Sequence, residues 1–149
     1  MPLWYNLSMS VVQEKRRKGK LEVCVKTLEL ASYTIQVTTN EKIFNPKFRA
    51  AITDDLISYA KDIYLICWTA NNIRITDDEE TYKERRRLQD KAILKCNAFL
   101  GLLDIAKKVF HLDTKRVTYW GKKIVECRTL IRAWRDSDKK RYGERYDSS

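Results

Sequence analysis

Hydrophobic residues recur along most of this chain at alternating steps of three and four, the spacing of residues on one face of an α-helix. The pattern predicts four amphipathic helices, which begin near Leu21, Pro46, Thr76 and Asp113. Glycine and proline are scarce, with 4 and 2 in 149 residues, so the chain lacks the frequent turns of a β-sandwich or barrel. In the first helix, the predicted buried face consists of Leu21, Cys24, Leu28, Ala31 and Ile35.

Three of the helices carry recognisable start signals. Asn45 can cap the second helix, and Pro46 suits its first position, because the N–H that proline lacks would have no helical partner there. Thr76–Glu79 has the form of a capping box, and Asp113 or Thr114 can cap the last helix. Short connections between long helices predict an all-α fold, an up-down-up-down four-helix bundle.

We expect this bundle to occupy residues 20–143. Residues 1–13 have no clear helical period, and a basic run, Lys15–Lys20, follows them, so we interpret residues 1–19 as a flexible basic N-terminal arm. Residues 144–149 are expected to form a frayed tail. No apolar run reaches the roughly 18–20 residues of a membrane span, and the basic run follows the apolar N-terminus, the reverse of a secretory signal. These features favour a cytoplasmic protein.

Residues suited to metal or acid–base chemistry are few. His111 is the only histidine, so a di-iron site, which needs Glu-x-x-His on two helices, cannot form. A Cys–His dyad is not expected either, because His111 falls at the end of a predicted helix. Four cysteines, one per helix, form no C-x-x-C pair, so we interpret them as small buried hydrophobic residues. Asp54 and Asp55 fall in the first turns of the second helix, where carboxylates interact favourably with the helix dipole. The sequence therefore predicts no catalytic residue, no metal ligand and no cofactor.

The charges are distributed unevenly along the chain. The chain carries 30 Lys and Arg against 20 Asp and Glu, a net charge of +10. Up to Glu84 it carries 12 of each sign, whereas from Arg85 onward it carries 18 Lys and Arg against 8 Asp and Glu. The whole excess therefore lies on the last two predicted helices, and such segregation favours a polyanionic partner.

Basic side chains follow one face of each of these two helices at steps of three and four. Like charges at this spacing repel, and the planar guanidinium of arginine suits phosphate, so a nucleic-acid backbone is the predicted ligand. A solvated charged face is the alternative for each stripe alone, and hydrophobic residues outside the predicted buried faces, such as Leu65 and Leu100, hint at self-association. The candidate nucleic-acid-binding residues are Arg85, Arg86, Arg87, Lys91 and Lys95 on the third helix, and Lys122, Lys123, Arg128, Arg132, Arg135 and Lys139 on the fourth.

Several short blocks, in order along the chain, resemble one group of small helical proteins. The blocks are Asn40–Arg49, Ala70–Asn72, Tyr82–Gln89, Lys95–Asn97, Tyr119–Trp120 and Ile131–Asp138. Over residues 21–143, the chain resembles the accessory variability determinant proteins of diversity-generating retroelements.

The resemblance implies a homopentameric barrel of four-helix subunits with a basic surface. It further implies a non-catalytic accessory subunit that binds the element's error-prone reverse transcriptase and its template RNA, or a cDNA–RNA hybrid, and supports mutagenic cDNA synthesis in retrohoming. A related bundle family, associated with intervening sequences in large ribosomal RNA genes, shares the fold. The alternative functions are therefore such a bundle protein, or a helical protein–protein scaffold, without a reverse transcriptase partner.

Overall fold

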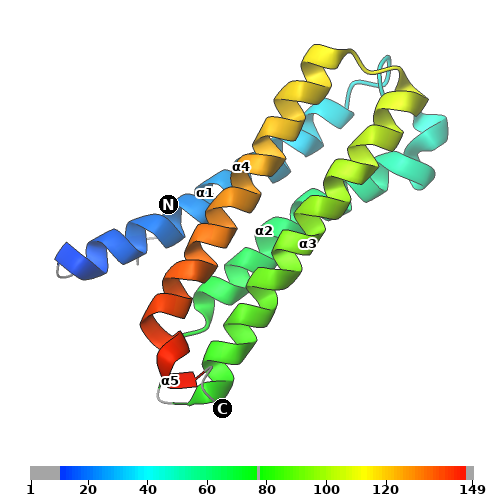
Figure 1. Ribbon diagram of the computed structural model, residues 1–149. Helices are drawn as coiled ribbons and strands as arrows, with labels where there is room; N and C mark the ends of the chain where they lie inside the picture. Colours follow the sequence, from blue (N-terminus) through cyan, green and yellow to red (C-terminus); the bar gives the residue numbers. More distant parts are fainter. Residues whose placement is uncertain (1–10, 77, 147–149) are drawn as a thin grey trace.

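The computed structural model describes residues 11–76 and 78–146, with side chains from residue 22 onward. In this part of the chain the secondary structure is all helical, with no strand (Figure 1). None of its helices is both long enough and apolar enough to cross a membrane. The four long helices are α1 (Val11–Thr38), α2 (Asp54–Asn72), α3 (Glu79–Phe110) and α4 (Thr114–Asp138).

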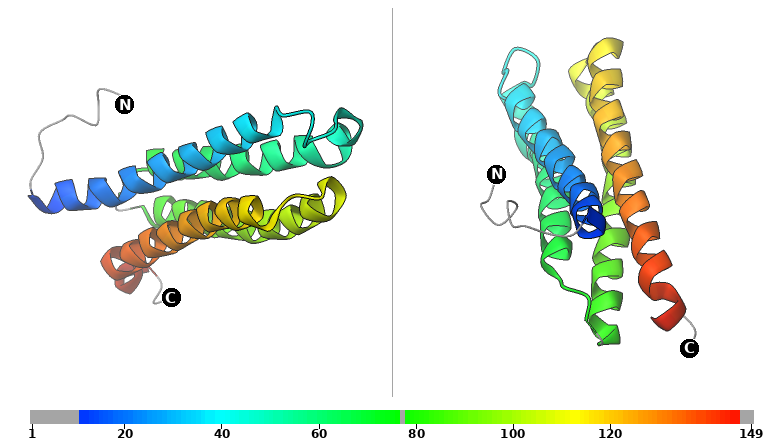
Figure 2. Two further views of the ribbon diagram at one scale, coloured as in Figure 1. Left: turned by 90° about the horizontal axis from the view of Figure 1, so that it is seen from above. Right: turned by 90° about the vertical axis from the view of Figure 1, so that its left-hand side faces the viewer.

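These four helices pack side by side, and successive helices run in opposite directions (Figure 1). Both α1 and α3 lie against α2 and α4, so each helix has two neighbours around a shared core. Figure 2 shows the α1–α2 pair and the α3–α4 pair as the two halves of the molecule. The predicted four-helix bundle is therefore confirmed for the single chain.

The start of α1 differs from the expected flexible arm. Residues 11–19 are helical and continue directly into the rest of α1. Gly19 lies within this helix, and one internal glycine weakens a helix by about 1 kcal/mol relative to alanine without ending it. The first turns of α1 extend beyond the bundle (Figures 1 and 2). Residues 1–10 of the expected arm lie outside the described residues.

Side-chain caps begin three of the helical segments. The side-chain oxygens of Asn45, Asp78 and Asp113 each accept a backbone N–H two or three residues further on, at 2.7–3.0 Å. The N-cap of α3 is thus Asp78, and the capping box expected at Thr76–Glu79 does not form. The Thr76 hydroxyl instead accepts the Asp78 N–H at 3.1 Å, within the turn that precedes α3.

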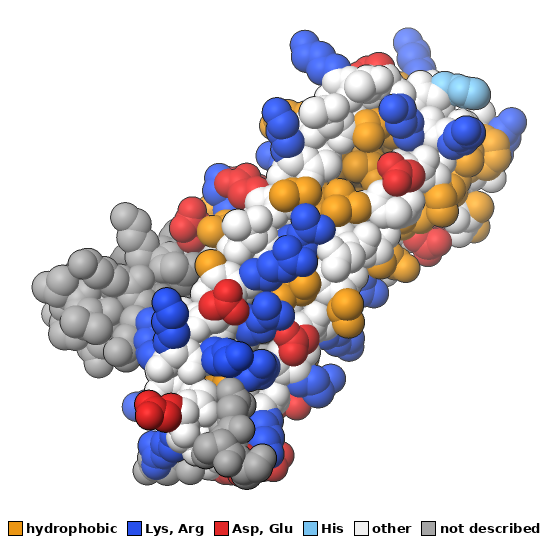
Figure 3. Space-filling view, viewed as in Figure 1, with side chains coloured by type: hydrophobic (Ala, Val, Ile, Leu, Met, Phe, Trp, Pro, Cys, Tyr) orange, Lys and Arg blue, Asp and Glu red, His pale blue; other side chains and the backbone are white. Residues whose placement is uncertain are grey.

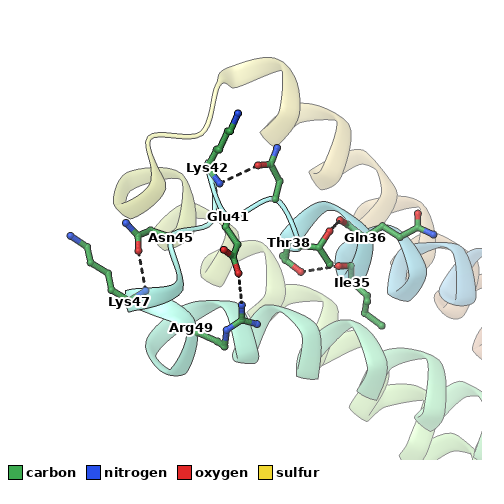
Figure 4. A network of polar contacts seen from close by, with 10 residues as sticks. Ile35, Gln36, Thr38, Glu41, Lys42, Asn45, Lys47 and Arg49 are labelled. Carbon is green, nitrogen blue, oxygen red and sulfur yellow. Dashed lines mark hydrogen bonds and ion pairs between the residues drawn. The ribbon is translucent and has the colours of Figure 1, made fainter.

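The connection from α1 to α2 contains two short helical turns. A 3₁₀ turn, η2 (Pro46–Phe48), is followed by a π-helical turn, η3 (Arg49–Thr53), so the regular α-helix begins only at Asp54. An ion pair between Glu41 and Arg49, 3.9 Å apart, links the loop to η3 (Figure 4). The helical start predicted at Pro46 is confirmed, although its first turns are not α-helical.

An aromatic cluster fills the core near this loop. Trp120 is fully buried, and its ring centroid lies 5.6 Å from that of Tyr33, 6.1 Å from Phe44 and 6.3 Å from Phe99. The indole Nε1 donates a hydrogen bond to the Thr34 hydroxyl at 3.2 Å, which satisfies its polar atom without water. The prediction that Trp120 belongs to the core is confirmed.

The buried face of α1 is rotated relative to the predicted one. Leu28 and Ile35 are 48% and 41% exposed, so their assignment to the core is wrong. Thr27 and Thr38 take core positions, because their hydroxyls donate to the carbonyls four residues earlier at 2.7 and 2.8 Å and so lose little on leaving water. Threonine counts as polar in a hydrophobic pattern, which shifted the prediction toward the leucine and isoleucine.

The C-terminal segment is ordered, contrary to the expected frayed tail. A π-helical turn, η4 (Lys139–Gly143), leads into the short α5 (Glu144–Tyr146). Tyr146 is buried, its ring stacks on Tyr82 with centroids 5.5 Å apart, and its hydroxyl donates to the Thr76 carbonyl at 2.8 Å. Aromatic burial thus holds residues 144–146, and residues 147–149 lie outside the described part.

All four cysteines are buried, as predicted, and none forms a disulfide. Burial raises the pKa of the Cys96 and Cys127 thiols to about 12, and it raises the pKa of Cys67 well above its ordinary value of 9.0. At neutral pH these thiols are therefore protonated and unreactive, since only the thiolate is a nucleophile.

We therefore expect the native protein to resist labelling by Ellman's reagent at pH 8, whereas the chain unfolded in guanidinium reacts at all four thiols. Stability should also fall as the pH rises from about 9 toward 12, because the unfolded thiols release protons that the native thiols retain. Rapid labelling of the native protein, at the rate of glutathione under the same conditions, would contradict the assignment of these residues to a closed core.

Candidate nucleic-acid interface

The basic stripe of α4 lies along its junction with α3. Arg128 Nη1 donates to Asn97 Oδ1 at 2.7 Å, and Arg135 Nη1 donates to Asp90 Oδ1 at 2.9 Å. Because both acceptors belong to α3, the stripe faces that helix, and Lys and Arg side chains gather over this junction (Figure 3). The common face predicted for Arg128, Arg132, Arg135 and Lys139 fits this placement, since they follow one another at steps of three and four.

A shallow groove at the lower end of this junction in the view of Figure 1 joins basic residues of both helices. Its lining consists of Tyr82, Lys83, Arg86, Arg87, Asp90 and Lys139. Three of the predicted residues, Arg86, Arg87 and Lys139, thus meet although they are far apart in the sequence. Segments 82–91 and 128–141 together hold eleven Lys and Arg against four Asp and Glu, so the surroundings of the groove are strongly cationic.

The predicted cations differ in how far local carboxylates neutralise them. Arg87 makes two hydrogen bonds to exposed Glu84, at 3.0 and 2.7 Å, which lower the pKa of that carboxyl group. Arg135 is paired with Asp90. In contrast, exposed residues Lys91, Arg132 and Lys139 make no hydrogen bond or ion pair with the described residues. These three are the cations best placed to meet an external phosphate. We call Arg86, Arg87, Arg128, Arg132, Arg135 and Lys139 the α3–α4 basic face; Lys91 lies between Arg87 and Lys95 on the stripe of α3.

The structure removes Arg85 from this face, so its prediction as a phosphate contact is wrong. Its side chain is only 2% exposed, and its guanidinium forms a two-pronged ion pair with buried Asp138. Gln89 Nε2 donates to the same carboxylate at 2.9 Å, and Arg85 Nη1 donates to the Ile73 carbonyl at 3.2 Å. The guanidinium carbon also lies 5.7 Å from the ring centroid of Trp134. This network joins the first turns of α3 to the last turn of α4 and to the loop before α3.

A further predicted residue, Lys95, turns toward α2. Lys95 lies 3.4 Å from Asp62 Oδ2 and 4.4 Å from the ring centroid of Tyr59, both on α2. A step of four residues overshoots one helical turn by about 40°, so the α3 stripe winds from solvent at Arg87 to the α2 side at Lys95. It does not form one continuous surface with α4, contrary to the sequence prediction.

On α4, Lys122 and Lys123 lie on a different face of the helix from the basic stripe. Lys123 lies over the rings of Tyr33 and Tyr119, toward α1, and Lys122 is exposed. Neither residue contacts α3 through any hydrogen bond or ion pair within the described ranges. Adjacent positions on a helix point about 100° apart, so a cluster in sequence does not stay a cluster in space.

A second basic region, which the sequence analysis missed, lies at the opposite end of the bundle. There the α1–α2 loop meets the turn between α3 and α4, as the 5.0 Å separation of the Phe44 and Phe110 ring centroids shows. His111, exposed and at φ 55°, ends α3 in the left-handed conformation. The cations that approach this end are Lys42, Lys47, Lys107, Lys108, Lys115 and Arg116. To find these cations from the sequence, one would have had to know that the α1–α2 loop lies beside the turn between α3 and α4.

No protein-family model, curated protein or solved structure matches this chain. The family resemblance of the sequence blocks therefore stays a hypothesis. Within residues 11–76 and 78–146, no group of three or more His, Cys, Asp or Glu side chains is arranged to hold a metal ion. Among the described residues, the α3–α4 basic face combines cations with a shallow groove, an arrangement that suits an extended polyanion.

The buried ion pair makes a stability prediction. Arg85→Ala leaves the Asp138 carboxylate buried without its partner, so we expect a loss of about 3–5 kcal/mol in the free energy of unfolding. The paired replacement Arg85→Met with Asp138→Leu removes both charges and should recover most of that loss. Urea denaturation followed by circular dichroism measures both. A loss below about 1 kcal/mol for Arg85→Ala would mean that the pair does not hold the two helices together.

Proposed function

We propose that this protein is a non-catalytic accessory subunit that binds the template RNA and the reverse transcriptase of a diversity-generating retroelement and supports mutagenic cDNA synthesis. The observation that carries the proposal is the α3–α4 basic face, which collects cations from two helices around one open groove. The blocks of sequence resemblance supply the identity of the partners. The cytoplasm, where such an element would replicate, is the proposed location.

The mechanism we propose is electrostatic. Lys91, Arg132 and Lys139 would contact RNA phosphates directly, because no described carboxylate competes for them. Arg87 and Arg135 would contribute less, since Glu84 and Asp90 already partly neutralise them. Each phosphate that a cation neutralises releases condensed counterions, which favours binding at low salt. Holding the RNA backbone in this way would keep the template beside the polymerase.

Self-association, as a homopentamer in the family that the sequence resembles, is part of the proposal. In the upper half of the view in Figure 3, hydrophobic side chains gather on the α3–α4 surface, with Lys and Arg side chains around them. Leu94 is 67% exposed, and Ile105 and Val125 are also exposed. Gly101 lies between the two α3 residues in the helix, and an added Cβ there would meet nothing within 4 Å, so this chain alone gives no packing reason for glycine. A second subunit packed closely against α3 would account for these features.

The same apolar surface supports the alternative, a helical scaffold whose partner is protein only. The two functions differ in the need for nucleic acid. A scaffold would purify without bound RNA and would show no dependence of affinity on the phosphate contacts. An rRNA-associated bundle protein would bind RNA without binding a reverse transcriptase, so copurification with the polymerase separates it from the proposed function.

RNA affinity should fall steeply with salt. We expect the logarithm of the association constant to decrease linearly with the logarithm of salt concentration, with a slope of about −0.7 for each phosphate contact to a single strand. Fluorescence anisotropy with a labelled RNA over a range of KCl concentrations measures this slope. A flat dependence would remove the phosphate-binding claim.

Charge reversal on the basic face should weaken binding specifically. Arg132→Glu with Lys139→Glu removes two unpaired cations, so we expect weaker RNA binding and a salt slope shallower by about 1.4. For the matched control, Arg132→Glu alone is compared with Lys61→Glu, which makes the same change in net charge at an exposed position on α2. Equal loss in both variants would show a response to net charge alone, and unchanged binding in the first variant would rule out this face.

Self-association should depend on the apolar half of the same surface. Leu94→Glu places a charge where we propose a neighbouring subunit, so the assembly is expected to dissociate while helicity is retained. Size-exclusion chromatography with light scattering gives the mass. Ile35→Glu is the control, because Ile35 is also exposed but lies on α1. A monomeric wild-type protein, or an oligomer untouched by Leu94→Glu, would contradict this arrangement.

A further inference from the structure

An aromatic and cationic cluster lies on the α1 side of α4, away from the α3–α4 basic face. The rings of Tyr33 on α1 and Tyr119 on α4 meet edge to face, with centroids 5.3 Å apart. Lys123 Nζ lies 4.9 Å from the Tyr119 centroid and 5.4 Å from the Tyr33 centroid. Tyr33 also packs against buried Trp120, which fixes the position of its ring. Tyr119, in contrast, keeps 52% of its surface exposed.

Beside this cluster runs a groove between α1 and α4. Its lining combines apolar surface with hydrogen-bonding groups: Val25, Leu28, Glu29, Ser32, Tyr33, Gln36 and Lys123. Nearly half of the Leu28 side chain is exposed here, although the hydrophobic pattern predicted it to be in the core. An exposed aromatic ring, an apolar floor and amide and hydroxyl groups at one place are the parts that recognise a flat polar ring.

The charges around the groove are separated along its length. Glu29 and Glu126 are both engaged by Lys26, whose ammonium lies 3.6 Å from an oxygen of each. At the tyrosine end, Lys123 makes no ion pair with any described carboxylate, and Lys122 beside it is exposed. Burial raises the pKa of Tyr33; Arg116 is close enough to oppose this shift, and Asp113 adds to it. The tyrosine end therefore carries Arg116, Lys122 and Lys123 against Asp113, whereas the other end holds two carboxylates and one ammonium.

We propose that this cluster is a binding site for an unpaired nucleobase of the RNA. The base stacks on the exposed ring of Tyr119, and the adjoining phosphate lies against Lys123. A nucleotide presents a π-face next to an anionic group, and Tyr119 with Lys123, one helical turn apart, offers the matching pair. Bases within a duplex stack on one another and leave no face for the tyrosine, so the site gives a preference for single-stranded RNA.

This inference rests on the proposed RNA-binding function, but it predicts a separate effect, a difference in affinity between single-stranded and duplex RNA. The α3–α4 basic face contacts phosphates only and binds single strands and duplexes alike. The Tyr119 cluster adds a stacking interaction that only unpaired RNA can make. The two contributions can therefore be separated by comparing the two forms of RNA.

The test measures the affinity of an adenine-rich unpaired RNA and of a duplex of equal length, by fluorescence anisotropy at fixed salt. Tyr119→Ala is expected to weaken binding of the unpaired RNA by roughly 5- to 100-fold and to leave duplex binding unchanged. Tyr119→Phe keeps the ring and should bind as the wild type does. Leu65→Ala, an equally exposed hydrophobic residue on α2, is the matched control. Circular dichroism confirms that each variant is folded.

Unchanged binding of unpaired RNA by Tyr119→Ala, or an equal loss for both RNAs, would overturn the stacking site. If the Arg132→Glu, Lys139→Glu variant still loses affinity in that case, the proposed RNA function stands without it. A wild-type protein that binds neither RNA would overturn both. If Tyr119→Ala keeps RNA affinity but loses copurifying reverse transcriptase, the groove binds a protein segment, and the nucleobase assignment is wrong.

Discussion

The buried ion pair between Arg85 and Asp138 is the interaction on which the arrangement of α3 and α4 depends. It spans 53 residues of sequence and joins the first turns of one helix to the last turn of the other, with Gln89 and the Ile73 carbonyl as additional partners. A buried charge without its partner is costly, so only one relative position of the two helices satisfies the network. That position also brings Arg86, Arg87 and Lys139 to a common groove. The buried pair thus determines the geometry of exposed cations that it does not touch.

Sequence periodicity was sufficient to predict the four helices and their order, because each helix must bury one face in any bundle. It was insufficient to predict which face of α1 is buried. Thr27, Thr34 and Thr38 occupy core positions, and two of these hydroxyls bond to the backbone of their own helix, which no hydrophobic pattern reveals. The C-terminal turn was missed for a related reason. Tyr146 is held by Tyr82 and the Thr76 carbonyl, partners that only the folded chain brings near.

The candidate site was predictable on α4 and only partly so on α3. In the run Arg85–Arg86–Arg87, successive side chains point about 100° apart, so they need not share one environment. Arg85 enters the core, whereas Arg86 and Arg87 both border the groove, and Arg87 is also paired with Glu84. The sequence makes the three arginines equivalent, and the partner that distinguishes Arg85 is Asp138, at the far end of another helix. Local charge spacing therefore indicated the surface but could not identify the buried member.

Buried and exposed positions alternate around α4, and this separation explains how one helix can carry so many charges and remain stable. Its contact with the core uses about one residue per turn: Trp120, Ile124, Cys127, Ile131 and Trp134. The two buried tryptophans contribute large apolar side chains to this face, and Val117 and Leu130 pack partly against the core beside it. On one side of this face, arginines of α4 meet α3, and on the other side Tyr119 and Lys123 meet α1. Because Arg132, Lys139 and Tyr119 are exposed, substitutions at these positions should alter ligand binding without unfolding the bundle, and each side can be tested while the other stays intact.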